Sequence, residues 1–164
     1  MGFTTYPDLG SSGAGGAGGD TMEIYSDEIA VGAGNITITA AYADAAGSGL
    51  GDTIMTCSNV VINSTSDLVF ISWNFQTFNT GSPTMVMGIQ SGSDTPVFLH
   101  QAFSPDATDV PYSGVFLASE LSLSAGTSDI KLLGSRSGGT SWSVYDNSNI
   151  HKARFSIVVV DKSS

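Results

Sequence analysis

Short segments of alternating apolar and polar residues follow one another along most of the chain after residue 22. In residues 35–42 the even positions carry apolar side chains, and positions 37 and 39 are threonines. A period of two is the signature of a β-strand with one buried face. The pattern therefore predicts a strand here, with the even side chains directed into a core.

Two longer segments show the same period. Residues 68–78 are predicted to form one long strand, with the odd positions from Val69 to Phe75 facing inward. Residues 153–160 close the pattern, and their odd positions, Phe155 to Val159, are also predicted to be buried. The other predicted inward sets are Met85, Met87 and Ile89; Val97, Leu99, Gln101 and Phe103; Val115, Leu117, Leu121 and Leu123; Ile130 and Leu132; Trp142 and Val144.

Turn signals separate these segments at short intervals. Residues 92–94, 124–126 and 135–139 are rich in Gly and Ser, which favour turns. About nine or ten short strands at regular spacing are typical of an all-β sandwich or barrel. No segment has the apolar period of a long amphipathic helix.

The charge of the chain limits its partners. Of 164 residues only 12% are charged and 41% are hydrophobic, and the formal net charge is −10. All five basic residues lie at position 131 or later. Because such a surface repels phosphate backbones and anionic lipid, we expect no nucleic-acid partner and no membrane partner.

The N-terminal segment differs in composition from the rest. Residues 11–19 are almost entirely Gly, Ala and Ser, which is typical of a flexible linker. We predict an extended Gly-rich arm over residues 1–24 and a sandwich domain over residues 25–164. Four residues near the start of the arm are the candidate anchors to a partner: Phe3, Tyr6, Pro7 and Leu9. No secretory signal is visible, so we expect synthesis in a cytoplasm.

Candidate chemistry is sparse, and we predict no enzymatic activity, no cofactor and no bound metal. The single cysteine, Cys57, has no partner for a disulfide, and we interpret it as a small buried residue. His100 and His151 have no second ligand at metal-binding spacing. Loop carboxylates, Asp106 with Asp109 and Asp27 with Glu28, leave calcium open as an alternative.

Aromatic residues near turns offer a second kind of site. Tyr112, Trp142 and Tyr145 are the candidates for stacking on a sugar. For Trp142 the alternative is a core position, because it is in phase with Val144.

The C-terminal half resembles a known family. The segments that carry the resemblance are Leu121-Ser-Leu-Ser-Ala-Gly-Thr127, the Ser-Gly-Gly-Thr140 loop with Ser141-Trp-Ser-Val-Tyr145, and the closing strand Arg154-Phe-Ser-Ile-Val-Val-Val-Asp161. Together they resemble the complement/tumour-necrosis-factor-like jelly rolls of tailed bacterial viruses, over roughly residues 60 to 161.

That resemblance implies an antiparallel jelly-roll sandwich that assembles as a homotrimer. It also implies a virion location and a structural function, as a capsid decoration or cement protein or as a fibre cap. On this view the N-terminal arm binds the major capsid protein or another virion protein. The alternative function is a carbohydrate- or host-receptor-binding tip, with a surface glycan as the partner.

Overall fold

A computed structural model describes residues 21–29, 34–42, 50–80, 84–103, 108–145 and 153–162. Its elements, in chain order, are β1 (Met22–Glu28), β2 (Ile36–Ile38), β3 (Asp52–Ile62), β4 (Leu68–Asn74), β5 (Gln76–Thr80), β6 (Thr84–Ser91), β7 (Val97–Phe103), β8 (Thr108–Asp109), β9 (Tyr112–Leu117), the 3-10 helix η1 (Ala118–Leu121), β10 (Gly126–Ser137), β11 (Ser141–Tyr145) and β12 (Arg154–Val160). No helix in this part of the chain is long and apolar enough to span a membrane.

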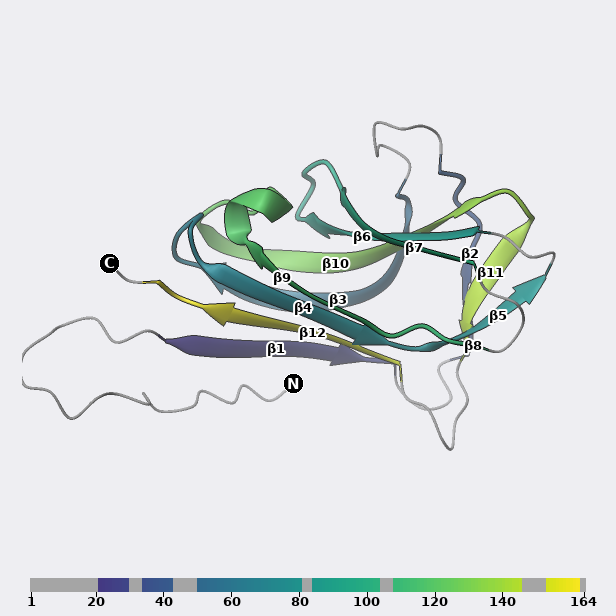
Figure 1. Ribbon diagram of the computed structural model, residues 1–164, viewed down its shortest axis with the longest axis horizontal. Coiled ribbons are helices and arrows are strands. Elements are labelled where there is room, and N and C mark those ends of the chain that lie inside the picture. The colour runs from purple at the N-terminus through teal and green to yellow at the C-terminus, as the bar shows by residue number, and fades with distance from the viewer. Residues whose placement is uncertain are drawn as a thin grey trace, which may run out of the picture.

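Two four-stranded antiparallel sheets form the body of the sandwich (Figure 1). Sheet I has the order β1-β12-β4-β9, and sheet II has the order β3-β10-β6-β7. Along the chain the strands of these sheets follow the sequence I, II, I, II, II, I, II, I. Eight antiparallel strands that cross between two sheets in this way form a jelly roll. The predicted all-β, antiparallel jelly-roll fold is therefore confirmed.

A third sheet extends one end of the sandwich. Sheet III has the order β2-β11-β5-β8, and each of its strands is the chain neighbour of the corresponding strand of sheet I. The strand predicted over residues 68–78 is interrupted at Phe75, and β5 turns away from β4 there (Figure 1). The Phe75 carbonyl accepts a hydrogen bond from Val110 N at 2.8 Å, outside the strand pairing. One predicted strand is thus divided between two sheets.

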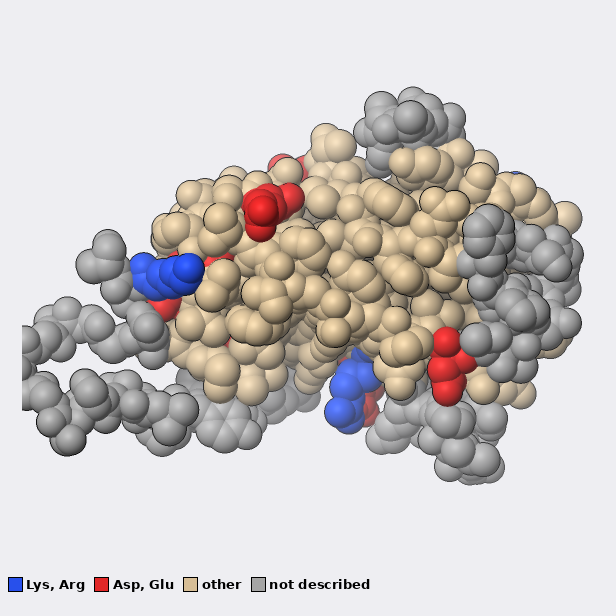
Figure 2. Space-filling model, in the orientation of Figure 1, with Lys and Arg blue, Asp and Glu red and all other residues tan. Residues whose placement is uncertain are grey.

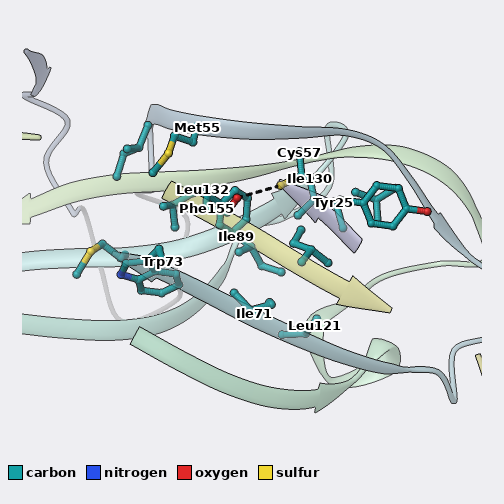
Figure 3. Packing of buried hydrophobic residues seen from close by; sticks show 14 of the residues in the cluster. Tyr25, Met55, Cys57, Ile71, Trp73, Ile89, Leu121, Ile130, Leu132 and Phe155 are labelled. Carbon is teal, nitrogen blue, oxygen red and sulfur yellow. Dashed lines mark hydrogen bonds between the residues drawn. The ribbon is translucent and has the colours of Figure 1, made fainter. Parts of the chain in front are cut away.

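The core lies between sheets I and II. From sheet I the inward side chains are Val69, Ile71, Trp73, Phe155, Ile157 and Val159, and all of them are buried as the alternation predicted. From sheet II, Met85, Met87, Ile89, Ile130 and Leu132 meet them (Figure 3). Each fully buried side chain of this size stabilises the fold by about 1.5–3 kcal/mol.

The predicted phase fails in β7 because the strand contains a bulge. The pairing shifts between Met87, opposite His100, and Gly88, opposite Phe98. After this bulge the even side chains turn toward the core, so Ala102 packs against it and Gln101 is exposed. The prediction that Gln101 faces inward is therefore wrong. A β-bulge adds a residue that a simple period of two cannot anticipate.

Two further expectations also fail locally. Val115 and Leu117 were predicted to face inward, yet both lie on the outward side of sheet I, where Val115 is 54% exposed, and Phe116 packs on the core instead. The run that follows forms η1 and not a strand, and Glu120 Oε2 accepts a hydrogen bond from Leu117 N at 2.8 Å. Leu121 is nevertheless buried, as predicted.

The boundary of the predicted arm also changes. Met22 to Ile24 were assigned to the arm, but they form the first part of β1 and pair with Val160 to Val158 of β12. The sandwich therefore begins at Met22. Residues 1–20 lie outside the described residues, so the arm itself stays a prediction.

Candidate functional site

The candidate arm anchors, Phe3, Tyr6, Pro7 and Leu9, lie outside the described residues. They remain candidates on the sequence alone.

Trp142 belongs to the core. It is 1% exposed, its ring stacks on Phe75 with centroids 6.3 Å apart, and its Nε1 donates a hydrogen bond to the Ser135 carbonyl at 2.9 Å. Gly134 leaves room for the ring, because a Cβ there would lie 2.8 Å from Trp142 Cζ2. A buried and satisfied indole offers no face to a sugar, so Trp142 is not a ligand-stacking residue in this structure.

Tyr112 joins an aromatic group at the edge of the sandwich. It lies in β9, the edge strand of sheet I, and stacks on Trp73 with ring centroids 4.1 Å apart. His100, from β7 at the edge of sheet II, lies 5.4 Å from the Tyr112 ring. Desolvation raises the pKa of the Tyr112 hydroxyl and lowers the pKa of His100. The indole nitrogen of Trp73 is buried without a hydrogen-bond partner. One face of the Tyr112 ring is thus occupied by the protein itself.

Tyr145 is the more accessible of the remaining aromatic candidates. It ends β11 opposite Gln76 of β5, and it is 36% exposed. Tyr145 belongs to sheet III, whereas Tyr112 belongs to sheet I.

Cys57 is buried and carries no features of a nucleophile. Its Sγ donates to the Phe155 carbonyl at 3.7 Å (Figure 3), and the side chain is 1% exposed. Desolvation, together with the nearby Asp27, raises the pKa of the thiol to about 12. The reactive species of a cysteine is the thiolate. The interpretation as a small buried residue is therefore confirmed.

Several of the described carboxylates accept hydrogen bonds from backbone N–H groups and so have a structural role. Asp27 Oδ2 accepts from Thr56 N at 2.9 Å, and Asp67 Oδ2 accepts from Asn63 N and Ser64 N, both at 2.9 Å. Glu28 pairs with Arg154. On the face of the molecule that Figure 2 shows, few of the described residues are charged. Within the described residues no three His, Cys, Asp or Glu side chains converge as metal ligands. Asp106, which the sequence analysis paired with Asp109 as a candidate calcium site, lies outside that part of the chain.

An open hollow of about 270 Å³ lies between residues 91–94 and 124–128. Small polar residues line it, and its edges are joined by the Ser91 and Ser128 hydroxyls, 2.9 Å apart. Asp94 is the one charged residue of this lining. The lining of the hollow therefore provides few charged groups and no large side chain with which to bind a ligand.

The outward surface of sheet I carries a larger feature, which we call the outer face of sheet I. Its side chains line up across the four strands in rows, because the strands pair in register. The first row is Met22, Val160, Leu68 and Leu117, and the second is Ile24, Val158, Phe70 and Val115. The third row is Ser26, Ser156, Ser72 and Ser113.

The two apolar rows are exposed to a considerable degree. Met22 is 37% exposed, Phe70 39% and Val115 54%. The other members are half-buried, and none belongs to the side chains that pack against the core cluster. Contiguous exposed apolar surface of this kind marks an interaction site.

A signal for this face was present in the sequence. A strand with one wet face should alternate, but residues 157–160 and 68–71 are apolar at every position. Such runs indicate burial on both faces. In residues 68–78 and 153–160 the predicted inward positions are the odd ones, which leaves the apolar Phe70 and Val158 on the side predicted to face solvent.

No protein-family model matches the chain, and no curated protein matches it. Among solved structures, it is similar to a chain in the structure of infectious bursal disease virus Gx strain, at 17% identity and a TM-score of 0.40, over 96% of this chain and 37% of that chain. A mutant VP2 protein of infectious bursal disease virus in derived T=1 particles is similar at 16% identity and a TM-score of 0.40, over 98% of this chain and 41% of that chain. A chain in the 2.6 Å structure of T=1 particles derived from the same virus is similar at 19% identity and a TM-score of 0.41, over 95% of this chain and 36% of that chain.

This chain therefore spans less than half the length of the viral chains it matches. Similarity at these identities and TM-scores does not indicate a shared function.

Proposed function

We propose that the chain is a virion structural protein that works by assembly. The observation that carries the proposal is the outer face of sheet I, where two complete apolar rows lie on the outward side of the sandwich. Jelly rolls occur in capsid and lectin domains alike, so the fold alone does not choose the function. An outward sheet face without charge favours assembly.

In its finer form, the proposal is a homotrimeric capsid decoration or cement protein, or a fibre cap. The resemblance of residues 60 to 161 to the jelly rolls of tailed bacterial viruses supports this form. Residues 1–20 would bind the major capsid protein or another virion protein through Phe3, Tyr6 and Leu9. Pro7 fixes the backbone locally among them.

Two measurements test this form. Light scattering of the full chain should give a mass of three times 16.8 kDa, and a monomer at micromolar concentration contradicts the trimer. Deletion of residues 1–20 should leave the β far-UV spectrum and the melting temperature nearly unchanged, because β1 begins at Met22. The truncated chain should no longer join the virion. If it joins at the occupancy of the full chain, the arm is not the anchor.

A carbohydrate- or receptor-binding tip is the second candidate, favoured by the exposure of Tyr145. A glycan-array signal that Tyr145→Ala abolishes without loss of fold would support it. Tyr112→Ala is a weaker probe, because it also uncovers Trp73. Loss of binding in that variant must be compared with its stability.

A further inference from the structure

The outer face of sheet I has a charge pattern that restricts its partner. Its first three rows contain twelve side chains and no charged group. The next row begins with Glu28 and Arg154, which neutralise each other. A chain of net charge −10 repels its own copies. A basic partner protein would bind best to a surface with exposed carboxylates. A face without carboxylates does not repel an acidic partner, so it suits a second chain that is itself acidic.

The size of the face fits a subunit contact. Four strands about 4.8 Å apart, and three rows about 6.7 Å apart along each strand, give a footprint of about 400 Å². The two apolar rows make up about two thirds of this footprint, and the whole is similar in size to the largest exposed patch of a typical monomer, about 300–600 Å², which is often functional. It is about half of the roughly 800 Å² that each partner contributes to a standard interface. The side chains around it would supply the rest.

The third row adds a self-complementary element. A serine hydroxyl both donates and accepts a hydrogen bond. A row of four serines therefore pairs with an identical row as readily as with any other polar surface. Ser26, Ser72 and Ser113 are exposed and available for such bonds.

From these observations we infer that the outer face of sheet I is covered by a second copy of the same chain. The inference rests on the proposed assembly function and deepens it, because it names the surface and the partner. Val158 and Phe70, in the middle row on the two inner strands, form the centre of the contact, and Val115 lies beside Phe70 on the edge strand. The serine row and the Glu28–Arg154 pair form one border.

Phe70 and Phe98 provide a matched test. They are the same residue type, 39% and 43% exposed, and lie on the outward surfaces of sheets I and II. The masses of the full chain, Phe70→Asp and Phe98→Asp are measured by sedimentation across a concentration series. A carboxylate in the apolar contact should weaken association at least about ten-fold. Phe98→Asp should associate like the unchanged chain.

Several outcomes would overturn the inference. These are a full chain that stays monomeric at about 100 µM, a Phe70→Asp variant with unchanged association, and a Phe98→Asp variant that dissociates equally. If Phe70→Asp fails to fold, Val115→Ser, at the 54% exposed position, takes its place.

The same experiment separates the inference from the trimer. The number of copies tests the trimer, whereas the response to Phe70→Asp tests the face. A dimer that separates in Phe70→Asp supports the face and refutes the trimer. A trimer whose association is unchanged in Phe70→Asp supports the trimer and refutes the contact at this face.

Discussion

The two outward surfaces of the sandwich are built differently. On sheet II, a cross-strand row is polar, formed by Thr56, Lys131 and Gln90. Where sheet II does carry outward apolar side chains, Val86 and Leu133, the chain covers them with Leu50 and Tyr42. On sheet I, Phe70, Val115 and their neighbours remain exposed. On sheet II the chain covers Val86 and Leu133 and leaves Phe98 43% exposed, whereas on sheet I it presents two whole apolar rows.

Leu50 and Tyr42, which we call the cover of sheet II, lie in segments that specific hydrogen bonds join to the sheet. Asp52 Oδ2 accepts from Thr39 N at 2.7 Å and from Ala40 N at 2.8 Å. Arg136 N donates to the Ala40 carbonyl, and Tyr42 N donates to the Arg136 carbonyl, both at 2.8 Å. Residues 40–42 thus lie along β10 beyond the point where its pairing with β3 ends at Asp52. This segment ties the covering side chains to the sheet that they protect.

The largest expected effect comes from opening the cover. Leu50→Ala removes a side chain that is 5% exposed and packs on Val86 and Leu133. It should lower the free energy of unfolding by about 2–4 kcal/mol, because the site cannot fully collapse. Urea denaturation measures the change. Val115→Ala, on the exposed face, is the control and should change stability by less than about 0.5 kcal/mol.

The next effect comes from crowding the same cover. A Cβ on Gly88 would lie 2.2 Å from the Val97 carbonyl oxygen and 2.5 Å from Leu50 Cδ1. Gly88→Ala should therefore cost about 1–3 kcal/mol. Adding Leu50→Ala should not restore stability, since the Val97 oxygen is backbone. A fully stable Gly88→Ala variant would show that β7 does not lie this close to β6.

The smallest expected effect lies at the border of the outer face of sheet I. Arg154→Ala breaks an exposed ion pair with Glu28, so stability should change by less than about 1 kcal/mol. The substitution also removes the positive charge that neutralises the Glu28 carboxylate at the border of the contact. Association should weaken at low salt and recover at high salt, because salt screens repulsion between exposed charges. Arg136→Ala is a poor control because that side chain holds the Thr39 and Gly139 carbonyls. Lys131→Ala, on sheet II, is better.

The period of the sequence predicted most of the core. Val69, Ile71 and Trp73 are buried because a strand against one core must alternate, and this local rule needs no knowledge of the partners. The break at Phe75 and the bulge in β7 escaped prediction, because each depends on how a strand meets its neighbours.

The candidate sites show the same division. Trp142 is in phase with Val144, and that phase correctly indicated the core position. The outer face of sheet I could be suspected from the unbroken apolar run at residues 157–160. Its rows appear only once the register joins Val158 to Ile24 and to Phe70. Register is a tertiary property that a single sequence does not provide.

Hydroxyl-radical footprinting of the unmodified chain tests the central claim most directly. Phe70 and Phe98 have nearly equal exposure in one copy, 39% and 43%, so they should oxidise at similar rates in dilute solution. As the concentration rises, the rate at Phe70 should fall while the rate at Phe98 stays constant, because a second copy covers sheet I. Equal rates at every concentration, or protection of Phe98 in place of Phe70, would contradict the claim.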